Sequence, residues 1–354
     1  MPDVNVLEGF AMVWASLALG VTLTALVRRR RPARSTGVDL TGTVVLRPID
    51  SPTQQELLNL AEPVPAGVRQ IVLCPFRPRL AAGVEWLASD PPVANRKLGH
   101  LQYAFAALRL PFERVVIVDG DVRIDEALLT NLVGGLDEGA AAAWAAPRPE
   151  AGGLARGVLV QSLHSFDVLA AIGPAPQAMC GKAVALGADA VEVLRTMPAC
   201  AGEDLELSSR LHARGLPIKL AGQARIPGRA AGQLQRFTRW MQVLRAHRPG
   251  LFPAVPVFFA CTPLLLPLAA VSGDVLTASI VAAVLVARTV VAALAERTEA
   301  SPQAPWWWLA GEVVLLVAWV GALLRGGRVV WRGRTLELGP GGSISTPVLR
   351  PTAP

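Results

Sequence analysis

Residues 115–124 read Val-Val-Ile-Val-Asp-Gly-Asp-Val-Arg-Ile, four β-branched residues followed by two carboxylates two positions apart. The apolar run predicts a short, buried strand. Ligands of open α/β sheets bind at the carboxyl ends of strands, so Asp119 and Asp121 are expected at a binding site. Mg²⁺ is commonly held by one or two carboxylates together with substrate phosphates. The pair therefore indicates a metal–nucleotide site, with a simple acidic turn after a strand as the alternative.

The residues around this strand alternate between strand and helix patterns. Strand patterns lie at residues 43–48 and 70–74, and helical patterns lie at residues 54–61 and 97–108. Such alternation predicts a mostly parallel sheet covered by helices. We expect an α/β domain over residues 37–230, which is long enough to bury its own core.

The composition indicates a membrane protein. The 354 residues are 52% hydrophobic and only 17% charged, with a mean hydropathy of +0.42, which is too apolar for an ordinary soluble domain. Residues 9–27 form an uncharged stretch of spanning length that ends at four consecutive arginines, residues 28–31. No basic segment precedes it and no clear cleavage site follows, so residues 1–36 are expected to be a retained anchor with its arginines in the cytoplasm.

Further apolar stretches follow the α/β domain. They lie at residues 251–271, 275–294 and 306–324. The first contains four prolines and is expected to be broken or partly re-entrant, while the third opens with three tryptophans, as in an interfacial aromatic belt. We expect two or three spans within residues 251–325, in which Arg288 and Glu312 neutralise each other.

The last segment, residues 326–354, is expected to be a basic, flexible tail with a disordered Gly/Ser/Pro-rich end from residue 339. Three C-terminal spans would place this tail outside, whereas its arginines favour the cytoplasm. If the proline-rich stretch does not cross, the tail returns inside. The sequence leaves both alternatives open.

The net charge and the cysteines exclude two other kinds of site. The formal net charge is +7, but the arginines cluster beside apolar stretches, so attraction to anionic lipid headgroups explains them better than nucleic-acid binding. The four cysteines have no metal-ligand spacing, and a cytoplasmic domain would keep them reduced.

A second acidic pair, Glu203 and Asp204, opens a predicted helix whose apolar face is Leu205, Leu207 and Leu211. Acids in a first turn complement the helix dipole, which is a purely structural role. The functional alternative is a general base that removes a proton from an attacking hydroxyl.

Residues 231–250 are predicted to hold a basic amphipathic helix directly before the first C-terminal apolar stretch. Such a helix lies by default at a membrane surface. Its Arg236, Arg239 and Trp240 are also candidates to close over an anionic diphosphate and a lipid acceptor.

Together, Asp-x-Asp, Glu-Asp and Arg-x-x-Arg-Trp, in this order and spacing, resemble the membrane-bound, inverting family 2-like glycosyltransferases. The closest resemblance is to the ceramide glucosyltransferase group and the hopanoid-associated glycosyltransferases. Nearly the whole chain takes part: the anchor, Val-Leu-Arg-Pro at 45–48, Asn-Arg-Lys-Leu at 95–98 and Val-Trp-Arg-Gly-Arg at 330–334. Arg236, in the first position of its motif, favours this group over the polysaccharide synthases, which usually have Gln there.

The resemblance implies a GT-A (nucleotide-diphospho-sugar transferase) domain with N- and C-terminal transmembrane helices. It also implies transfer of a sugar from a nucleotide-sugar donor, UDP-linked, to a lipid hydroxyl such as that of ceramide or a hopanoid. The protein would then act in glycolipid or sphingolipid biosynthesis, with its catalytic domain on the cytoplasmic side of a bacterial inner membrane.

The resemblance also implies roles for the site residues. Asp119 and Asp121 would hold Mg²⁺ or Mn²⁺ against the diphosphate. Asp204 would deprotonate the acceptor, and Glu203 would tune it by like-charge repulsion. The diphosphate and the acceptor entrance would be contacted by Lys97, Arg236, Arg239 and Trp240.

One departure weakens the assignment of UDP more than that of sugar transfer. The family usually has an acid after the second strand, where residues 74–79 read Cys-Pro-Phe-Arg-Pro-Arg. Asp90 could substitute for it, or backbone atoms could hold the base. The acceptor region, expected at about residues 161–182, has no readable code, and the sequence leaves the oligomeric state open.

Three other functions remain alternatives. A processive polysaccharide synthase uses the same core but normally carries more spans. Another lipid-linked sugar transferase would differ in its acceptor. A catalytically degenerate membrane protein would keep the fold as a binding module.

Overall fold

The computed structural model describes residues 4–27, 35, 37–108, 113–150, 153–154, 156–157, 178–226, 232–296, 306–331 and 334–345. The chain divides into two compact units, each built from separate stretches of sequence. The helical unit comprises Met1–Arg30, Pro149–Ala175 and Gly228–Gly326, and the sheet unit comprises Arg31–Arg148, Pro176–Pro227 and Gly327–Pro354. The arginines at 28–31, most of the expected acceptor region (161–177) and the end of the tail (346–354) lie outside the described residues.

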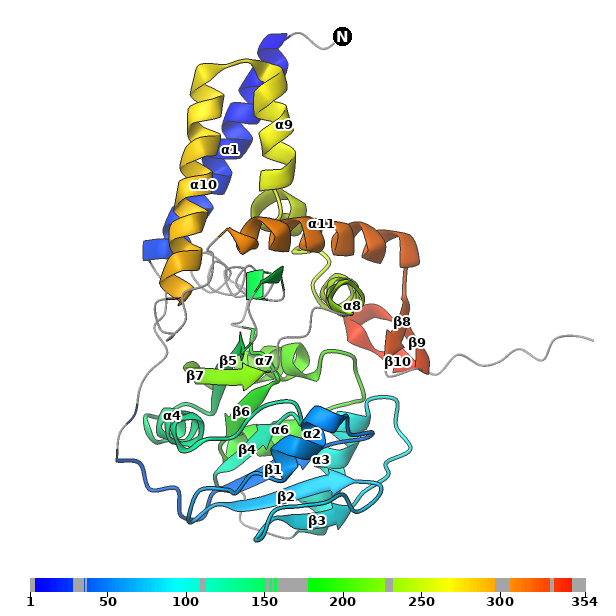
Figure 1. Ribbon diagram of the computed structural model, residues 1–354. Helices are drawn as coiled ribbons and strands as arrows, with labels where there is room; N and C mark the ends of the chain where they lie inside the picture. Colours follow the sequence, from blue (N-terminus) through cyan, green and yellow to red (C-terminus); the bar gives the residue numbers. More distant parts are fainter. Residues whose placement is uncertain are drawn as a thin grey trace, which may run out of the picture. The chain divides into compact units, whose positions relative to one another are not determined.

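The sheet unit is built on a seven-stranded sheet with the order β3-β2-β1-β4-β6-β5-β7 (Figure 1). Its strands are β1 (Val44–Pro48), β2 (Arg69–Cys74), β3 (Glu85–Ala88), β4 (Val115–Val118), β5 (Ala142–Pro149), β6 (Ala183–Leu186) and β7 (Ile218–Ile226). The first four strands pair in parallel, whereas β6 runs antiparallel to both β4 and β5. The predicted α/β class and its mostly parallel sheet are confirmed.

Among the described residues, five helices flank this sheet. They are α2 (Gln54–Leu60), α3 (Arg96–Ala107), α4 (Glu126–Asp137), α6 (Ala188–Arg195) and α7 (Glu203–Ala213). Alternation along the strands divides their side chains between two faces, so Leu46 and Ile117 join a core with α3, α6 and α7. The expected apolar face of α7 is formed by the buried Leu207 and Leu211, while Leu205 is half-buried.

The segment after residue 327 contains a second sheet of three antiparallel strands. They are β8 (Arg328–Trp331), β9 (Arg334–Leu338) and β10 (Ile344–Ser345). Val329 and Leu336 are buried on it, and the backbone N–H of Ala201 donates to the carbonyl of Gly342 at 2.8 Å. Residues 328–345 of the expected flexible tail therefore contain ordered strands, which a backbone hydrogen bond and the bridge between Cys200 and Ser343 join to the rest of the sheet unit.

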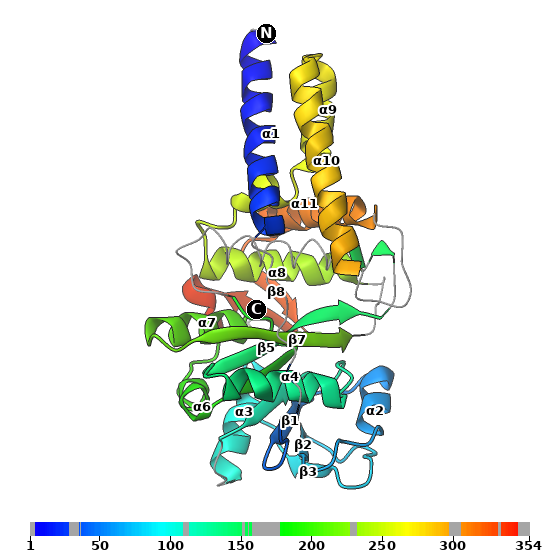
Figure 2. The ribbon, with the colours of Figure 1, turned by 90° about the vertical axis from the view of Figure 1, so that its left-hand side faces the viewer.

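The helical unit contains α1 (Val4–Val27), α8 (Gln233–His247), the short π-helix η1 (Val255–Phe259), α9 (Thr262–Ser272), α10 (Val275–Glu296) and α11 (Trp307–Arg325). Three of these segments are long and apolar enough to cross a membrane: Val6–Val27, Val275–Leu294 and Trp307–Arg325. α1, α9 and α10 lie side by side (Figures 1 and 2), joined by a core of small and branched residues. That core includes Ala15, Ala18, Leu265, Ala269, Val281 and Val284.

A buried ion pair fastens α10 to α11. Arg288 and Glu312 are only 3% and 0% exposed, and their side chains form the ion pair expected from the sequence. Glu312 also accepts from the backbone N–H of Thr262 at 2.9 Å, and Arg288 donates to the Thr262 hydroxyl at 3.0 Å. Since both charges have further hydrogen-bond partners, the pair is satisfied without water and holds three helices together.

We expect Glu312→Gln to destabilise the helical unit, because it leaves the Arg288 guanidinium buried without its counter-charge. Breaking a buried pair in this way costs about 3–5 kcal/mol in other proteins. Thermal unfolding of the purified protein in detergent should show a lower Tm than for the half-buried control Glu8→Gln. An unchanged Tm for Glu312→Gln would contradict this account, and the double change Arg288→Met with Glu312→Leu should recover much of the loss.

Candidate active site

The carboxylates of Asp119 and Asp121 follow β4, in a turn that a buried arginine of the neighbouring strand supports. The Arg47 guanidinium donates to the carbonyl oxygens of Asp119, Gly120 and Val122 at 3.3, 2.9 and 2.7 Å. Burial lowers the pKa of Arg47 to about 10, although the nearby negative charges of Asp121 and Asp119 act in the opposite direction. Arg47 therefore holds the backbone of the turn in place through these three hydrogen bonds.

The second acidic pair opens α7, as the sequence predicts. One Asp204 oxygen accepts from the backbone N–H of Gly181 at 2.9 Å, and the other accepts from the N–H of Leu205 at 2.9 Å. Burial raises the pKa of Asp204 to about 6, and repulsion from the Glu203 carboxylate adds to this effect. A carboxylate with this pKa can both accept and release a proton near neutral pH.

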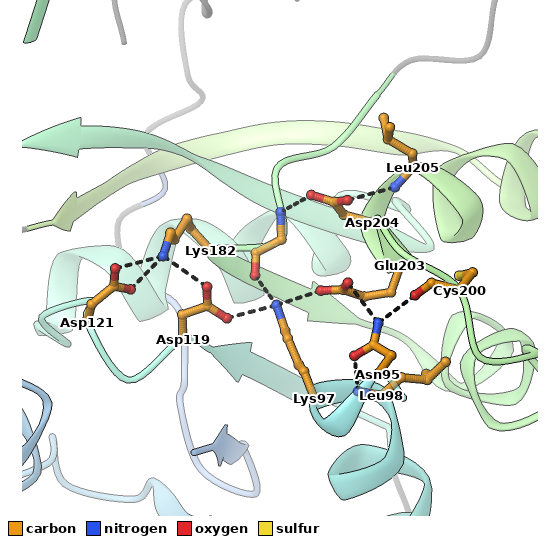
Figure 3. Close-up of polar contacts among 11 residues, drawn as sticks. Asn95, Lys97, Leu98, Asp119, Asp121, Lys182, Cys200, Glu203, Asp204 and Leu205 are labelled. Carbon is orange, nitrogen blue, oxygen red and sulfur yellow. Dashed lines mark hydrogen bonds and ion pairs between the residues drawn. The ribbon is translucent and has the colours of Figure 1, made fainter. Parts of the chain in front are cut away.

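Lys97 connects the two acidic pairs (Figure 3). Its Nζ lies 2.8 Å from Asp119 Oδ1 and 3.0 Å from Glu203 Oε1, and it donates to the Gly181 carbonyl at 2.7 Å. Lys97 stands in the first turn of α3, which Asn95 caps by accepting from the N–H of Leu98 at 3.0 Å. The Asn95 amide also donates to Glu203 Oε2 at 3.2 Å.

A second lysine, which the sequence did not single out, lies between the carboxylates of the first pair. Lys182 Nζ is 2.7 Å from both oxygens of Asp121 and 3.1 Å from Asp119 Oδ2. The pairing of β6 with β4 brings it there, and the Asp119 N–H donates to the Lys182 carbonyl at 2.9 Å. Recognition of residues 183–186 as a strand antiparallel to β4 would have identified Lys182 from the sequence.

The two lysines determine the charge state of Asp119. Burial by itself would raise the pKa of this carboxyl, but Lys97 and Lys182 more than offset burial and hold the pKa well below its usual range. Burial likewise opposes the charged form of Lys97, yet Asp119 and Glu203 raise its pKa above the usual value. The described site therefore contains ionised groups of both signs at neutral pH.

Gly181 is where the loop before β6 approaches both acidic pairs. A Cβ at this position would lie 3.2 Å from the Asp204 Cβ and 3.2 Å from Lys97 Nζ, which is tighter than ordinary van der Waals contact. Any other residue would push Lys97 or Asp204 aside, so glycine permits the hydrogen bonds that this loop makes to both.

The Asp119 and Asp121 side chains fit a divalent cation. Three of their oxygens already converge on one positive charge, the Lys182 ammonium. Within the described part of the chain, no group of three or more His, Cys, Asp or Glu side chains could hold a metal ion. Two carboxylates together with phosphate oxygens form a typical Mg²⁺ site. A metal here would therefore be coordinated both by these two side chains and by the oxygens of a bound diphosphate.

The remaining predicted residues are held by other elements. Arg236, Arg239 and Trp240 are on α8 in the helical unit, where the Arg236 guanidinium lies 5.1 Å from the centre of the Trp240 ring. Their role at a diphosphate stays a prediction. Asp90, suggested as a substitute for the missing acid, forms an ion pair with Arg96.

A comparison with sequence models of protein families gives a match. The sequence model of Glycosyl transferase family 21 matches residues 78–344, which is well over half of the chain. The chain belongs to this family. The matched residues include both acidic pairs, Lys97 and Lys182, and the match confirms the resemblance to GT-A glycosyltransferases. This family 21 protein is therefore a glycosyltransferase, whereas a search among curated proteins finds no match.

A comparison with solved structures identifies the fold. A mannosyltransferase from Pyrobaculum calidifontis, solved with GDP-mannose and Mn²⁺, aligns over 90% of this chain and 99% of its own, with a TM-score of 0.53 and 15% identity. A glucosyl-3-phosphoglycerate synthase from Mycobacterium tuberculosis, solved with Mn²⁺, UDP-glucose and phosphoglyceric acid, aligns over 58% of this chain and 80% of its own, with a TM-score of 0.35 and 18% identity. The first alignment shows that the fold of this family 21 glycosyltransferase is GT-A, and the second is too weak to add to it.

We expect Arg47→Met to disorder the turn that carries Asp119 and Asp121, because it removes a buried donor from three backbone carbonyls. The carbonyls of Asp119 and Gly120 keep a second donor, the Val122 N–H and the Asn59 amide, so the Val122 carbonyl is expected to lose most. Each unsatisfied buried group costs about 1–3 kcal/mol. The measurements are the Tm and the affinity for a nucleotide sugar, and both should fall. Arg69→Met on the adjacent β2 removes an exposed pair with Glu85 and should change neither. Equal losses in the two variants would contradict a specific role for Arg47.

Proposed function

We propose that this glycosyltransferase transfers a hexose from a UDP-sugar to a hydroxyl group of a membrane lipid, ceramide or a hopanoid, with inversion at the anomeric carbon. The reaction would take place at the cytoplasmic face of a bacterial inner membrane. The observation that carries the proposal is the joining of two acidic pairs by one lysine, with Asp204 the carboxylate suited to accept a proton.

In the proposed reaction, Asp204 accepts the proton of the acceptor hydroxyl as the oxygen attacks the anomeric carbon. The new bond forms between that oxygen and the sugar, and the bond between the sugar and the nucleoside diphosphate breaks. A single displacement of this kind inverts the anomeric centre. Glu203 supports the base through its negative charge, which favours the protonated form of Asp204.

Asp119 and Asp121 are the residues that would hold Mg²⁺ or Mn²⁺. A bound metal ion would neutralise the charge that develops on the leaving diphosphate. Carboxylates outnumber lysines among the side chains that meet at this site, so a donor carrying a diphosphate needs an additional positive charge to bind there. The Mn²⁺ of the archaeal mannosyltransferase structure is consistent with this assignment.

Four further residues are proposed to bind the donor and the acceptor. Lys97 would contact the donor phosphates while keeping Asp119 and Glu203 in place. Arg236 and Arg239 would pair with the diphosphate, and Trp240 would shape the entrance for the lipid. The stacking of Arg236 on Trp240 supports this, since it joins a positive charge to an apolar surface.

The nucleotide of the donor is the least constrained part of the proposal. Residues 74–79 contain no acid to contact a nucleoside, which weakens the case for uridine. The archaeal mannosyltransferase that shares this fold was solved with GDP-mannose. GDP-mannose is therefore the second donor to examine.

The lipid acceptor is supported by the helical unit. Three of its helices have the length and apolar character of membrane spans. α8 covers the residues for which the sequence predicts a basic interfacial helix. A transferase anchored in this way meets lipid hydroxyls in the plane of the membrane rather than soluble acceptors.

The test is a donor and acceptor screen with the purified protein in detergent and Mn²⁺ or Mg²⁺. UDP-glucose, UDP-galactose, UDP-N-acetylglucosamine and GDP-mannose are each offered with a total lipid extract, and products are identified by mass spectrometry. We expect one glycolipid that disappears when the metal is chelated. A polysaccharide product would favour a synthase, and the absence of nucleotide binding would favour a degenerate binding protein.

Asp204→Asn should lower the rate of transfer by about 10²–10⁴-fold, the usual contribution of general base catalysis, and leave donor binding intact. Asp121→Ala should weaken metal-dependent donor binding. The matched control is Asp189→Asn, which changes an exposed acid in the first turn of α6 and should transfer normally. Appreciable turnover by Asp204→Asn would remove Asp204 from the role of base.

The activity should depend on pH through Asp204. Its pKa is raised to about 6, and only the ionised form accepts a proton, so kcat/KM should fall as the pH drops below about 6. Glu203→Gln removes the repelling charge and should move this fall toward the ordinary carboxyl value of about 3.9. The control Glu206→Gln lies in the same first turn but pairs with Arg210 at 2.6 Å, and it should leave the profile unchanged. Identical profiles in all three proteins would refute the assignment.

A further inference from the structure

The chain leaves the sheet unit and later returns to it, which limits how it can cross a membrane. Residues 228–326 belong to the helical unit, and residues on both sides of them belong to the sheet unit. The return is fixed by the hydrogen bond from Ala201 to Gly342 and by the bridge between Cys200 and Ser343. Because one compact unit lies on one side of a bilayer, residues 228–326 must cross it an even number of times.

Three apolar segments in this region are candidates to cross the membrane: η1 with α9, α10, and α11. An even number of crossings means that not all three can span it. α9 and α10 form a hairpin. Gly273 ends α9 with a left-handed φ of +68°, and the Asp274 carboxylate accepts from the N–H of Thr277 at 2.7 Å to begin α10. Both helices pack along α1 through one core, so the three form a single bundle.

α11 has a different orientation within the helical unit. Figure 1 shows it running across the bundle near one end, with the last turns of α10 beyond it, whereas α1, α9 and α10 run lengthwise. In Figure 2, the view turned by 90°, the bundle stays upright and α11 is foreshortened. No α11 residue belongs to the described core of the bundle.

The contacts of α11 agree with this orientation. Its first half meets the end of the bundle, where Glu312 contacts Thr262 and the Trp308 indole donates to the Thr289 hydroxyl at 3.2 Å. Its second half meets α8 instead, because Gln242 donates to the Gly326 carbonyl at 3.0 Å. A helix that crossed the membrane beside α1 and α10 would contact the bundle along its whole length.

One face of α11 is apolar and open. Val313, Val317, Val320 and Leu324, spaced at helical intervals, are 45%, 48%, 42% and 83% exposed. Trp306 and Trp307 stand at its start and Arg325 at its end. Aromatic and basic residues gather at the membrane–water interface, both along flat helices and at the ends of spanning ones, so the contacts of α11 decide between the two orientations.

From these observations we infer that α11 lies flat in the membrane surface, with its Val313–Val317–Val320–Leu324 face inserted among lipids. The crossings of this region are then made by the hairpin of η1–α9 and α10, and α1 makes the third. The partner of the open face is the bilayer itself, which is continuous with the lipid that surrounds the apolar bundle. The tail stays on the side of the sheet unit, which answers the question that the sequence leaves open.

Electron paramagnetic resonance of spin-labelled protein in lipid vesicles tests this inference directly. Val313→Cys, Val317→Cys, Val320→Cys and Leu324→Cys are labelled one at a time, and collision with oxygen and with a water-soluble nickel chelate gives the depth of each label. The native cysteines are buried, and the unsubstituted protein measures background labelling. Gel filtration and a Tm measurement confirm that each variant is folded.

We expect all four labels at one shallow depth. At about 1.5 Å per residue, a spanning helix would instead separate the labels at 313 and 324 by about 16 Å. Labels at Leu276→Cys and Val290→Cys on α10 provide the matched control and should differ in depth by about 21 Å. Graded depths along α11 would overturn the inference, as would labels reached by neither reagent, since a second copy or another protein would then cover the face. The readout does not involve catalysis, so it stands or falls independently of the proposed reaction.

Discussion

Two lysine ammonium groups hold the acidic residues of this site together. Lys97 bridges Asp119 and Glu203, and Lys182 bridges Asp119 and Asp121. Like charges at such distances would repel strongly in a partly buried site, so the carboxylates can converge only with these counter-charges. These residues come from four parts of the chain, and the lysines therefore also fix the end of β4, the start of α3, the loop before β6 and the start of α7.

Neutral groups also help to hold the acids of this network in place. Arg47 does not pair with either carboxylate of the turn but binds three of its carbonyl oxygens. The carboxylates thereby keep their charge available, while the backbone that carries them is held rigidly. Asn95 has the same function at the other pair, since it caps α3 and orients Glu203 through one amide group. The acids are thus positioned by the two lysines and, in addition, by contacts that do not neutralise them.

Local patterns predicted the elements that carry the acids, because a run of β-branched residues at 115–118 and the apolar spacing after residue 203 need no distant partner. The place of Lys182 was not predictable in this way, since it depends on the register of Val118 with Ala183 in an antiparallel pair. The same holds for the strands after residue 327, whose contact with Ala201 is also long-range. Hydropathy could not orient α11 either, because a flat helix and a spanning helix can have the same composition.

The return of the chain end to the sheet unit sets an order for biosynthesis. The loop that leads into α7 and its two acids receives a backbone partner, Gly342, only after more than 100 further residues have been synthesised. The apolar helices of the described helical unit precede that residue. The last contact of the acid-bearing region is therefore made only after the hydrophobic segments have had the opportunity to enter the bilayer. The backbone contacts of the sheet unit are in this way completed after the apolar helices have been made.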